Sequence, residues 1–412
     1  MPPKVSWKLN LAMLWFSQLV IFAGFQALIP FVPLFIKNEL GITDKVELAA
    51  AVTAFNFFGT FAYAIFNPIW GSLADRFGVK PMLLRGTFVT GLIFPLMAYS
   101  KTVLILVLLR FITAGCAGTT AASQTMIVRN TPNENQGFAL GVLTTAIWGG
   151  SMLGYVIGGL LIHYFDYTVA FWVCGMMYLA GGISILFTRD GAIQAVHGKS
   201  HIEKSGLARF IPQFTRATWV MLVLFLLMGF VRSFEVPYVA LKVEELTNKE
   251  TAAFWTGITS AVVCAAAILS GIGTGYLVDR LPANKILIPV MLVSGFAVAM
   301  QGVAGNLWVF AAGRVLFYVA AGGLQPVLQK VLAVITPQRK RGSVFGFASS
   351  TQGIGTMLAA AGSGVAMVHC GVSGVFYIGA LCFILMLPVC IKSISFATRP
   401  PVFHRVKRKN AC

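Results

Sequence analysis

The sequence predicts an all-α integral membrane protein, with twelve transmembrane helices in two pseudo-symmetric six-helix bundles. Composition is the first observation behind this prediction. Of the 412 residues, 57% are hydrophobic and 11% are charged, whereas an average globular domain has about 25% charged residues. The second observation is that apolar runs of about 20 residues, the length that spans a bilayer, follow one another almost from end to end. The third is that the second half of the chain repeats the layout of the first.

Six apolar segments are expected in the first half. The first, residues 10–37, contains Pro30 and Pro33, which should kink or end it at the external side because proline removes a backbone hydrogen bond. It is too long for the apolar core of a signal peptide, so we expect a retained helix. The other five are expected at residues 46–70, 81–99, 103–128, 138–164 and 169–187.

A polar, basic stretch at residues 189–217 divides the chain. The second half supplies six further segments, at residues 219–241, 254–276, 285–301, 307–329, 342–368 and 372–391. The predicted organisation is an N-terminal bundle (1–188), a cytoplasmic basic linker (189–217), a C-terminal bundle (218–394) and a basic cytoplasmic tail (395–412).

The distribution of charge predicts the orientation of the helices. The formal net charge is +18, and most of the 31 Lys and Arg residues fall in segments that are cytoplasmic if the N-terminus is cytoplasmic. Because this is the positive-inside bias of membrane proteins, we expect both termini in the cytoplasm. No basic tract is interleaved with aromatic residues, so no nucleic-acid partner is expected. The seven cysteines have no metal-ligand spacing, so neither a disulfide framework, a metal site nor a cofactor is expected.

A densely charged stretch, GSLADRFGVK, joins the second and third segments. So short a connection between two bilayer-length segments predicts a tight turn at the membrane surface. Gly71 and Gly78 permit the backbone geometry that such a turn needs. Asp75 stands among cations that include Arg76 and Lys80. We interpret the stretch as a latch whose ion pairs hold two membrane segments in one state and release them in another. The alternative is an ordinary solvated turn.

This stretch also reveals an internal repeat. Sliding the second half over the first aligns it with GYLVDRL, and the charged residues then pair as Asp75 with Asp279 and Arg76 with Arg280. At the same offset Arg110 falls on Arg314. Two intramembrane arginines that coincide at the offset of two DR turns indicate tandem copies, related by an axis along the membrane normal as in known secondary transporters.

These residues resemble the major facilitator superfamily, specifically its twelve-helix drug:proton antiporter branch, over essentially the whole chain. GSLADRFGVK is similar to the superfamily signature Gly-x-Leu-x-Asp-Arg-x-Gly-Arg-Lys, with Val79 in place of an arginine. LRFITAGCAG, around Arg110, is similar to the helix-four motif, with its glycine one position later. GSMLGYVIGG resembles the helix-five antiporter motif, with Tyr155 in place of a proline. The glycines that match this last motif are Gly150, Gly154, Gly158 and Gly159.

Charged side chains inside the bilayer are the candidates for proton coupling, because each costs about 2.5 to 3.5 kcal/mol at mid-membrane on insertion scales. Glu235 is the only carboxylate well inside a predicted helix, and a buried carboxylate can be neutral when dehydrated and charged when wet. Arg232 lies about one helical turn earlier and is expected to hold Glu235 ionised. The resemblance implies a coupling role for Arg110, and Arg314 is its repeat mate. The alternatives are a static buried pair, or a glutamate close enough to the outer surface to be wet, since Pro237 and a polar helix end follow it.

The resemblance also implies a central cavity between the two bundles. The mid-helix aromatic and amide residues expected to line it are Gln26, Asn56, Trp148, Phe234, Trp255, Gln325 and Gln352. A mostly aromatic cavity with a few amides suits amphiphilic molecules.

The function predicted by these features is proton-coupled export of small amphiphilic compounds or drugs by alternating access. We expect a monomer in the cytoplasmic (inner) membrane of a bacterium, with a small-molecule substrate, protons and membrane lipids as its partners. Two alternatives stay open: export of one specific metabolite, siderophore or sugar, and an importer or facilitator. An enzyme is not expected, because no paired nucleophile and base lies within the bilayer segments.

Overall fold

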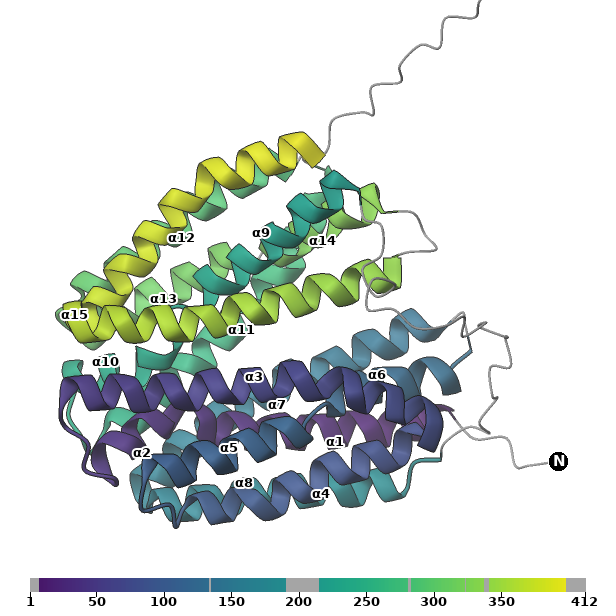
Figure 1. Ribbon diagram of the computed structural model, residues 1–412, viewed down its shortest axis with the longest axis horizontal. Coiled ribbons are helices and arrows are strands. Elements are labelled where there is room, and N and C mark those ends of the chain that lie inside the picture. The colour runs from purple at the N-terminus through teal and green to yellow at the C-terminus, as the bar shows by residue number, and fades with distance from the viewer. Residues whose placement is uncertain are drawn as a thin grey trace, which may run out of the picture.

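The computed structural model describes residues 7–132, 135–189, 215–280, 283–322, 324–336 and 341–397. These residues form helices that run side by side in two bundles, one from each half of the chain, stacked as the lower and upper parts of Figure 1. The start of α1 and the end of α15 lie toward the same end of the molecule, on the right in Figure 1. We call this the terminal end and the opposite end the distal end. The predicted linker and tail lie almost entirely outside the described residues.

The N-terminal bundle begins with α1 (Trp7–Leu28), a 3-10 turn η1 (Ile29–Phe31) and α2 (Val32–Asn38). It continues with α3 (Lys45–Phe77), α4 (Val79–Met97), α5 (Val103–Cys116), α6 (Thr119–Asn130), α7 (Gln136–Tyr164) and α8 (Tyr167–Leu186).

The C-terminal bundle has a matching order. It begins with α9 (Arg216–Ser233), the 3-10 turn η4 (Val236–Tyr238) and α10 (Val239–Leu246). It continues with α11 (Ala252–Arg280), α12 (Ala283–Val303), α13 (Leu307–Ala321), α14 (Leu324–Ile335) and α15 (Arg341–Ala397).

Twelve membrane crossings follow from these helices. Nine spans of the described part are long and apolar enough to cross a membrane, and two shorter apolar helices, α5 and α13, continue into α6 and α14. The longest span, Phe347–Phe396, contains two crossings because the backbone reverses at Gly371, where φ is 75°. Figure 1 shows α15 folding back at the distal end. The predicted all-α fold of two six-helix bundles is thus confirmed.

Short polar side chains begin several helices at the distal end. Asp44 accepts hydrogen bonds from two backbone N–H groups at the start of α3, and Asp166 accepts one at the start of α8. Thr102 and Asn306 accept the equivalent bond at the starts of α5 and α13. Such caps satisfy N–H groups that have no partner within the helix, which fixes where each span starts.

Three segments predicted as continuous are broken. The segment 103–128 divides at Gly118, whose φ of 115° suits glycine because it has no Cβ. The segment 307–329 divides between α13 and α14, next to Gly322, the repeat mate of Gly118. The segment 219–241 divides at η4, where Pro237 lacks the N–H that a helix would use. The kink predicted at Pro30 is confirmed by η1.

The breaks occupy equivalent places in the two halves. Leu28 precedes η1 and Glu235 precedes η4, each as the N-cap of a proline-containing 3-10 turn. The helix packing repeats as well. A Cβ on Gly150 would overlap the carbonyl of Leu19, and a Cβ on Gly355 would overlap the carbonyl of Leu226. The tandem repeat inferred from the sequence is therefore present in the packing of α7 on α1 and of α15 on α9.

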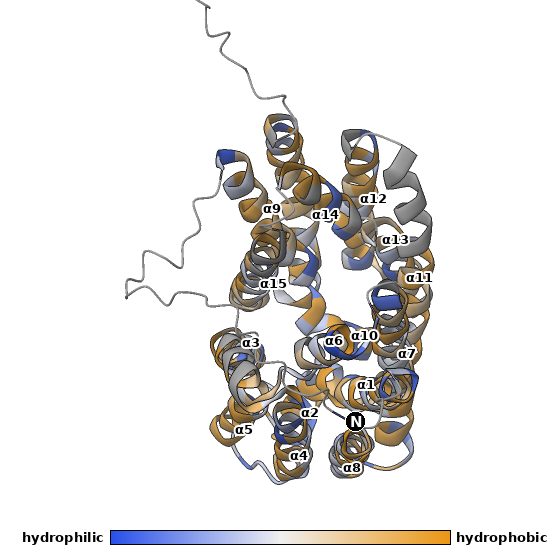
Figure 2. Ribbon diagram, turned by 90° about the vertical axis from the view of Figure 1, so that its right-hand side faces the viewer, coloured by the Kyte–Doolittle hydropathy of each residue, from blue (hydrophilic) through white to orange (hydrophobic). Residues whose placement is uncertain are grey.

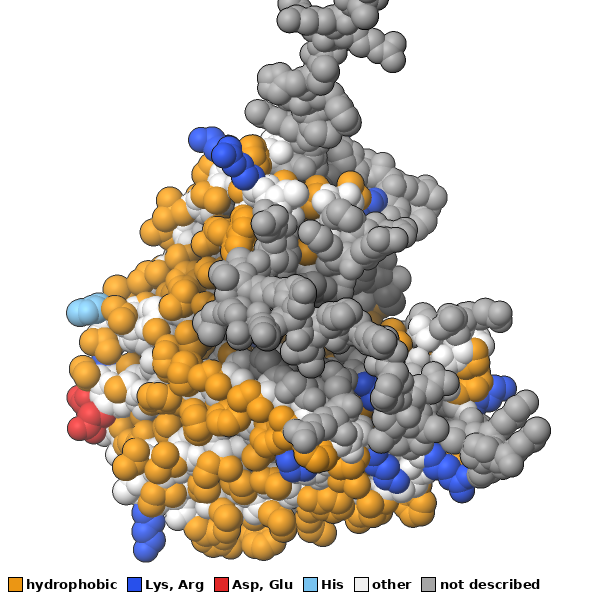
Figure 3. Space-filling view, turned by 45° about the vertical axis from the view of Figure 1, so that its right-hand side comes forward, with side chains coloured by type: hydrophobic (Ala, Val, Ile, Leu, Met, Phe, Trp, Pro, Cys, Tyr) orange, Lys and Arg blue, Asp and Glu red, His pale blue; other side chains and the backbone are white. Residues whose placement is uncertain are grey.

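The two bundles meet where α15 packs on α3 and α11 packs on α7. In the view along the helices, most of the ribbon at the circumference of the molecule is coloured as hydrophobic (Figure 2). Some hydrophilic residues lie toward the middle of the molecule, on α10 and α14. The outer surface in Figure 3 is broadly hydrophobic, with Lys and Arg side chains mostly toward the terminal end and carboxylates at the distal edge. This arrangement suits a protein whose circumference contacts lipid.

Candidate functional site

A fully buried carboxylate lies at the break in the seventh span. Glu235 is 0% exposed and stands between α9 and η4. Its Oε1 atom lies 3.7 Å from Nη1 of Arg314 on α13, and neither carboxylate oxygen has a hydrogen-bond partner. Charge-assisted hydrogen bonds are usually about 2.7–2.9 Å long. Glu235 and Arg314 therefore form a long ion pair without a direct hydrogen bond.

The cation within 4 Å of Glu235 is Arg314, and the predicted role of Arg232 in holding Glu235 ionised stays a prediction. Arg232 lies on the preceding turn but is only half-buried, and no ion pair within 4 Å joins it to Glu235. Where α9 tightens into the 3-10 turn, the Glu235 side chain is directed into the bundle beside α13, and the repeat mate Arg314 takes the place expected for Arg232.

Arg314 has two further neighbours. Its Nη1 atom donates to Oε1 of Gln301 on α12 at 3.4 Å, and its Cζ atom lies 5.4 Å from the ring centroid of Tyr318. The guanidinium is thus shared among a carboxylate, an amide and an aromatic face.

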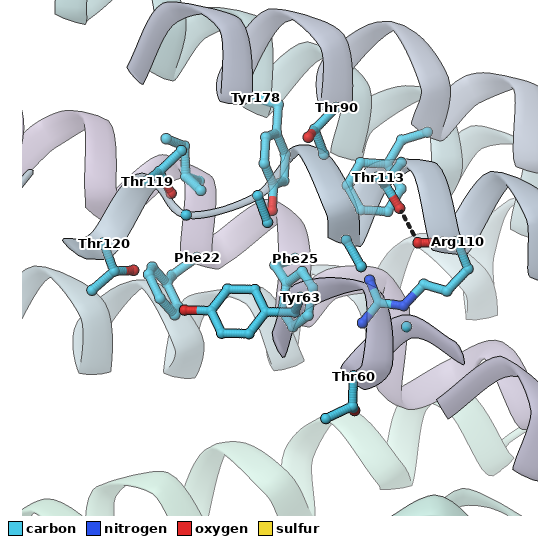
Figure 4. Close-up of a pocket in the computed structure, with 16 residues that line it drawn as sticks. Phe22, Phe25, Thr60, Tyr63, Thr90, Arg110, Thr113, Thr119, Thr120 and Tyr178 are labelled. Carbon is cyan, nitrogen blue, oxygen red and sulfur yellow. Dashed lines mark hydrogen bonds between the residues drawn. The ribbon is translucent and has the colours of Figure 1, made fainter. Parts of the chain in front are cut away.

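The repeat mate Arg110 lies in the other bundle, beside a cavity of about 270 Å³ (Figure 4). The lining residues come from α1, α3, α4, α5, α6 and α8 and from the α5–α6 break. The guanidinium of Arg110 points toward the space that Phe25 and Tyr63 also face. Its Cζ atom lies 5.3 Å from the ring centroids of Phe25 and Phe55. Arg110 therefore does not join Glu235 in one site.

None of the seven residues predicted to line a central cavity lines the cavity beside Arg110. Gln325 and Gln352 exchange side-chain hydrogen bonds of 3.1 and 3.2 Å. Asn56 donates to the carbonyl of Val52 in its own helix. Phe234 is buried against Phe230.

The other three predicted cavity residues lie elsewhere. Trp255 stacks edge-on against Trp308 and is partly buried against the main core. Trp148 is exposed, and its backbone carbonyl accepts from Cys264. Gln26 is half-buried. A central cavity made by the seven residues stays a prediction.

The charged turn between α3 and α4 is as tight as predicted, since α3 ends at Phe77 and α4 begins at Val79. Gly78 between them has a φ of 95°. Lys80 donates to the carbonyls of Leu186 and Thr188 at the end of α8, at 2.7 and 2.6 Å. The side chains of the remaining latch residues lie outside those described: Gly71, Asp75, Arg76, Asp279 and Arg280. Their latch role stays a prediction.

The glycines of the helix-five motif serve two helix contacts. Gly150, Gly154 and Gly158 face α1, and a Cβ on any of them would overlap a carbonyl of that helix. Gly159 faces α11 of the other bundle, where a Cβ would lie 2.8 Å from the carbonyl oxygen of Ala253. The motif thus holds α7 against its own bundle and brings it close to the second one.

A cluster that the sequence did not predict joins the bundles at the distal end. Nζ of Lys37 lies 2.6 Å from Oε2 of Glu244, and Nδ2 of Asn38 donates to Oε1 of the same carboxylate at 3.2 Å. We call Lys37, Asn38 and Glu244 the distal clasp. Because α2 and α10 are far apart in the chain, the spacing of residues in the sequence does not predict this contact.

Comparison with known proteins decides the family. The family model of the Major Facilitator Superfamily matches residues 14–300 and 256–410, which is most of the chain. The chain belongs to the major facilitator superfamily. It is thus a multi-pass integral membrane transporter of small molecules, and the resemblance stated from the turn and helix-five motifs is confirmed.

Several curated relatives of this superfamily member are named as multidrug efflux proteins. The multidrug resistance protein MdtG of Salmonella arizonae is 28% identical over 387 residues, which cover 92% of this chain and 95% of the relative. The multi-drug resistance efflux pump PmrA of Streptococcus pneumoniae is 28% identical over 391 residues, covering 92% and 94%.

Solved structures of other transporters share the fold. A crystal structure of a mutant of the nucleoside transporter NupG has a TM-score of 0.77 at 12% identity and covers 96% of this chain and 100% of that one. A bacterial homologue of the human lysosomal transporter Spinster, in an inward-facing and unoccupied conformation, has a TM-score of 0.71 at 16% identity, covering 96% and 97%.

Proposed function

We propose that this superfamily member exports small amphiphilic compounds in exchange for protons, by alternating access, with both termini in the cytoplasm. The observation that supports proton coupling most strongly is the Glu235–Arg314 pair. It is a carboxylate with no exposure and no hydrogen bond, opposite one guanidinium at 3.7 Å. The names of the relatives MdtG and PmrA favour export over import.

The chemistry of coupling is a change in one charge. While Glu235 is ionised, its charge and that of Arg314 compensate each other inside the bundle. A proton that arrives from the distal side neutralises the carboxylate and removes the attraction, which is strong in a medium of low dielectric constant. Arg314 then relies on Gln301 and Tyr318. Release of the proton toward the cytoplasm restores the pair, and the substrate moves in the opposite direction.

Contacts at the two ends of the molecule determine which side of the membrane the substrate site faces. With the distal end facing outward, the distal clasp closes the outer side in the state observed here, and its opening exposes the substrate site to the exterior. We further propose that the turn residues Asp75, Arg76 and Lys80 stabilise the opposite, outward-facing state from the cytoplasmic side. Alternation between two packings of rigid bundles is a common route for such transitions.

Glu235→Gln tests this function, because the amide keeps the size of the side chain and cannot take part in proton exchange. In proteoliposomes with an imposed pH gradient, we expect the wild-type protein to export members of a panel of aromatic acids, neutral compounds and amines, and to lose that export when an ionophore collapses the gradient. Glu235→Gln should fall to the background rate.

The matched control is Glu250→Gln, which changes an exposed carboxylate near the distal surface and should export like the wild type. Wild-type export that is indifferent to the ionophore would contradict proton coupling, as would wild-type rates from Glu235→Gln.

A further inference from the structure

The two repeat-related arginines have different surroundings. Arg314 has a carboxylate and an amide beside it, Glu235 and Gln301. In the N-terminal bundle the position of Glu235, at the N-cap of the 3-10 turn, is occupied by Leu28. At the offset that pairs the arginines, Gln301 falls on Met97. Arg110 thus keeps the cation of the repeat, while both polar partners are replaced by buried apolar side chains.

No other group in the described part compensates the charge of Arg110. Its Nε atom is buried without a hydrogen-bond partner, and no described carboxylate lies within the 4 Å of an ion pair. Phe25 and Phe55 offer ring faces, and a cation–π contact stabilises a cation without neutralising it. Arg110 as a whole is half-buried, and a cation that is partly removed from water is stabilised by an anion beside it.

The empty space beside Arg110 has a second unpartnered polar group. The Thr90 hydroxyl is buried, has no hydrogen-bond partner and lines the same cavity. The cavity also has aromatic walls formed by Phe22, Phe25 and Tyr63 (Figure 4). The cavity thus has two donors without hydrogen-bond partners and an aromatic wall, which are features of a ligand site. Its volume of about 270 Å³ is close to the lower end of the usual range for ligand sites, which is about 300–1,000 Å³.

We propose that this cavity is an anion subsite that binds the carboxylate of a small aromatic acid or zwitterion. The carboxylate faces the guanidinium of Arg110 and the hydroxyl of Thr90, and the aromatic body lies along Phe25 and Tyr63. The guanidinium suits this role because it presents donors in a fork that matches two carboxylate oxygens. The proposal rests on the proposed transport function and specifies its substrate class, since a purely cationic compound would be repelled here.

Binding of three matched probes to the full-length protein in lipid nanodiscs tests the subsite without any gradient. The probes are 2-naphthoate, 2-naphthamide and 2-naphthylmethylammonium, measured by isothermal titration calorimetry. The wild-type protein should bind naphthoate about tenfold or more tightly than naphthamide, as expected for a hydrogen bond to a charged group, and should bind the ammonium probe most weakly. Equal affinities of the wild-type protein for naphthoate and naphthamide would overturn the proposal, and this comparison needs no variant.

Variants then test whether Arg110 causes the preference for naphthoate over naphthamide. Arg110→Met should abolish the preference for naphthoate and leave naphthamide binding unchanged, and Arg110→Lys should retain part of it. Gly59→Ala keeps the charge but places a Cβ 2.6 Å from Nε of Arg110, so it should also weaken the preference. The control is Lys101→Met, which removes an exposed cation next to the same span and should bind like the wild type. An unchanged preference in both Arg110 variants would overturn the assignment.

The experiments distinguish a failure of the anion-subsite proposal from a failure of the proton-coupled export proposal. A carboxylate preference that depends on Arg110, together with transport that ignores the proton gradient, would support the subsite and contradict proton-coupled export. Gradient-driven export by a protein that binds naphthoate and naphthamide equally well would support proton-coupled export and contradict the subsite.

Discussion

Glu235 lies at the break in the seventh span, and Arg314 on α13 is the cation that forms an ion pair with it at 3.7 Å. Its burial beside a cation is consistent with the sequence, in which it is the only carboxylate well inside a predicted span, and a buried charge needs a partner or a role. Its role in proton coupling stays a prediction. Its partner was not predictable from helical spacing, which favoured Arg232. The choice of Arg314 depends on how α13 packs beside the 3-10 turn, and that packing leaves no mark in the local sequence.

Replacing Arg314 alone should destabilise the protein. Arg314→Met leaves the Glu235 carboxylate buried without its cation, and removing one partner of a buried pair typically costs about 3–5 kcal/mol. The double variant Glu235→Gln, Arg314→Met removes both charges and should recover most of that loss. Thermal unfolding followed by tryptophan fluorescence in detergent measures both changes. A double variant no more stable than Arg314→Met would show that the two side chains are not coupled.

At the scale of elements, the apolar pattern predicted where the spans lie better than how they are built. The prediction that Pro30 kinks the first span is confirmed, because proline has a fixed backbone consequence. The breaks at Gly118 and next to Gly322 were missed, because apolar residues continue across them and a glycine within an apolar run is compatible with an unbroken helix. The glycines of α7 were predicted as a contact surface, but which helix they contact is a tertiary property.

The contact between α7 and α1 gives a prediction at this scale. Gly158→Ala places a methyl group against the carbonyl of Ala27, and overpacking of this kind typically costs about 1–3 kcal/mol. Gly149→Ala, on the same helix, has no atom within 4 Å of the added Cβ and should be neutral or slightly stabilising, since alanine favours helix. When the thermal stability of the two variants is measured side by side, Gly158→Ala should be less stable than Gly149→Ala. Equal stability would mean that α7 does not approach α1 as closely as described.

At the scale of the whole molecule, the repeat of GSLADRF in GYLVDRL predicted two bundles correctly, because tandem copies fold alike. No pattern in the sequence indicates where the bundles touch. The contacts of Lys37 and Asn38 with Glu244 join helices from opposite halves, and only their relative placement brings them together. The same holds for the cavity beside Arg110, whose lining comes from several separate helices and the α5–α6 break.

Weakening the distal clasp should shift the whole molecule toward the outward-facing state. Glu244→Gln removes the ion pair with Lys37, whose side chain is 33% exposed, so solvent screening limits its contribution to about 1 kcal/mol. That corresponds to about a fivefold change in the ratio of the two states. Hydrogen–deuterium exchange should rise in α2 and α10. Glu245→Gln, which breaks only a pair within α10, is the control, and equal exchange in both variants would contradict a bridging role.

The central claim, that Glu235 is the proton carrier, is tested most directly by counting protons released when substrate binds. Purified protein in weakly buffered detergent solution is titrated with a transported compound while a pH indicator records the release. The wild-type protein should release up to about one proton per bound molecule, because one buried carboxylate exchanges it, and Glu235→Gln should bind the compound and release none. Proton release by Glu235→Gln equal to that of the wild type would contradict the claim.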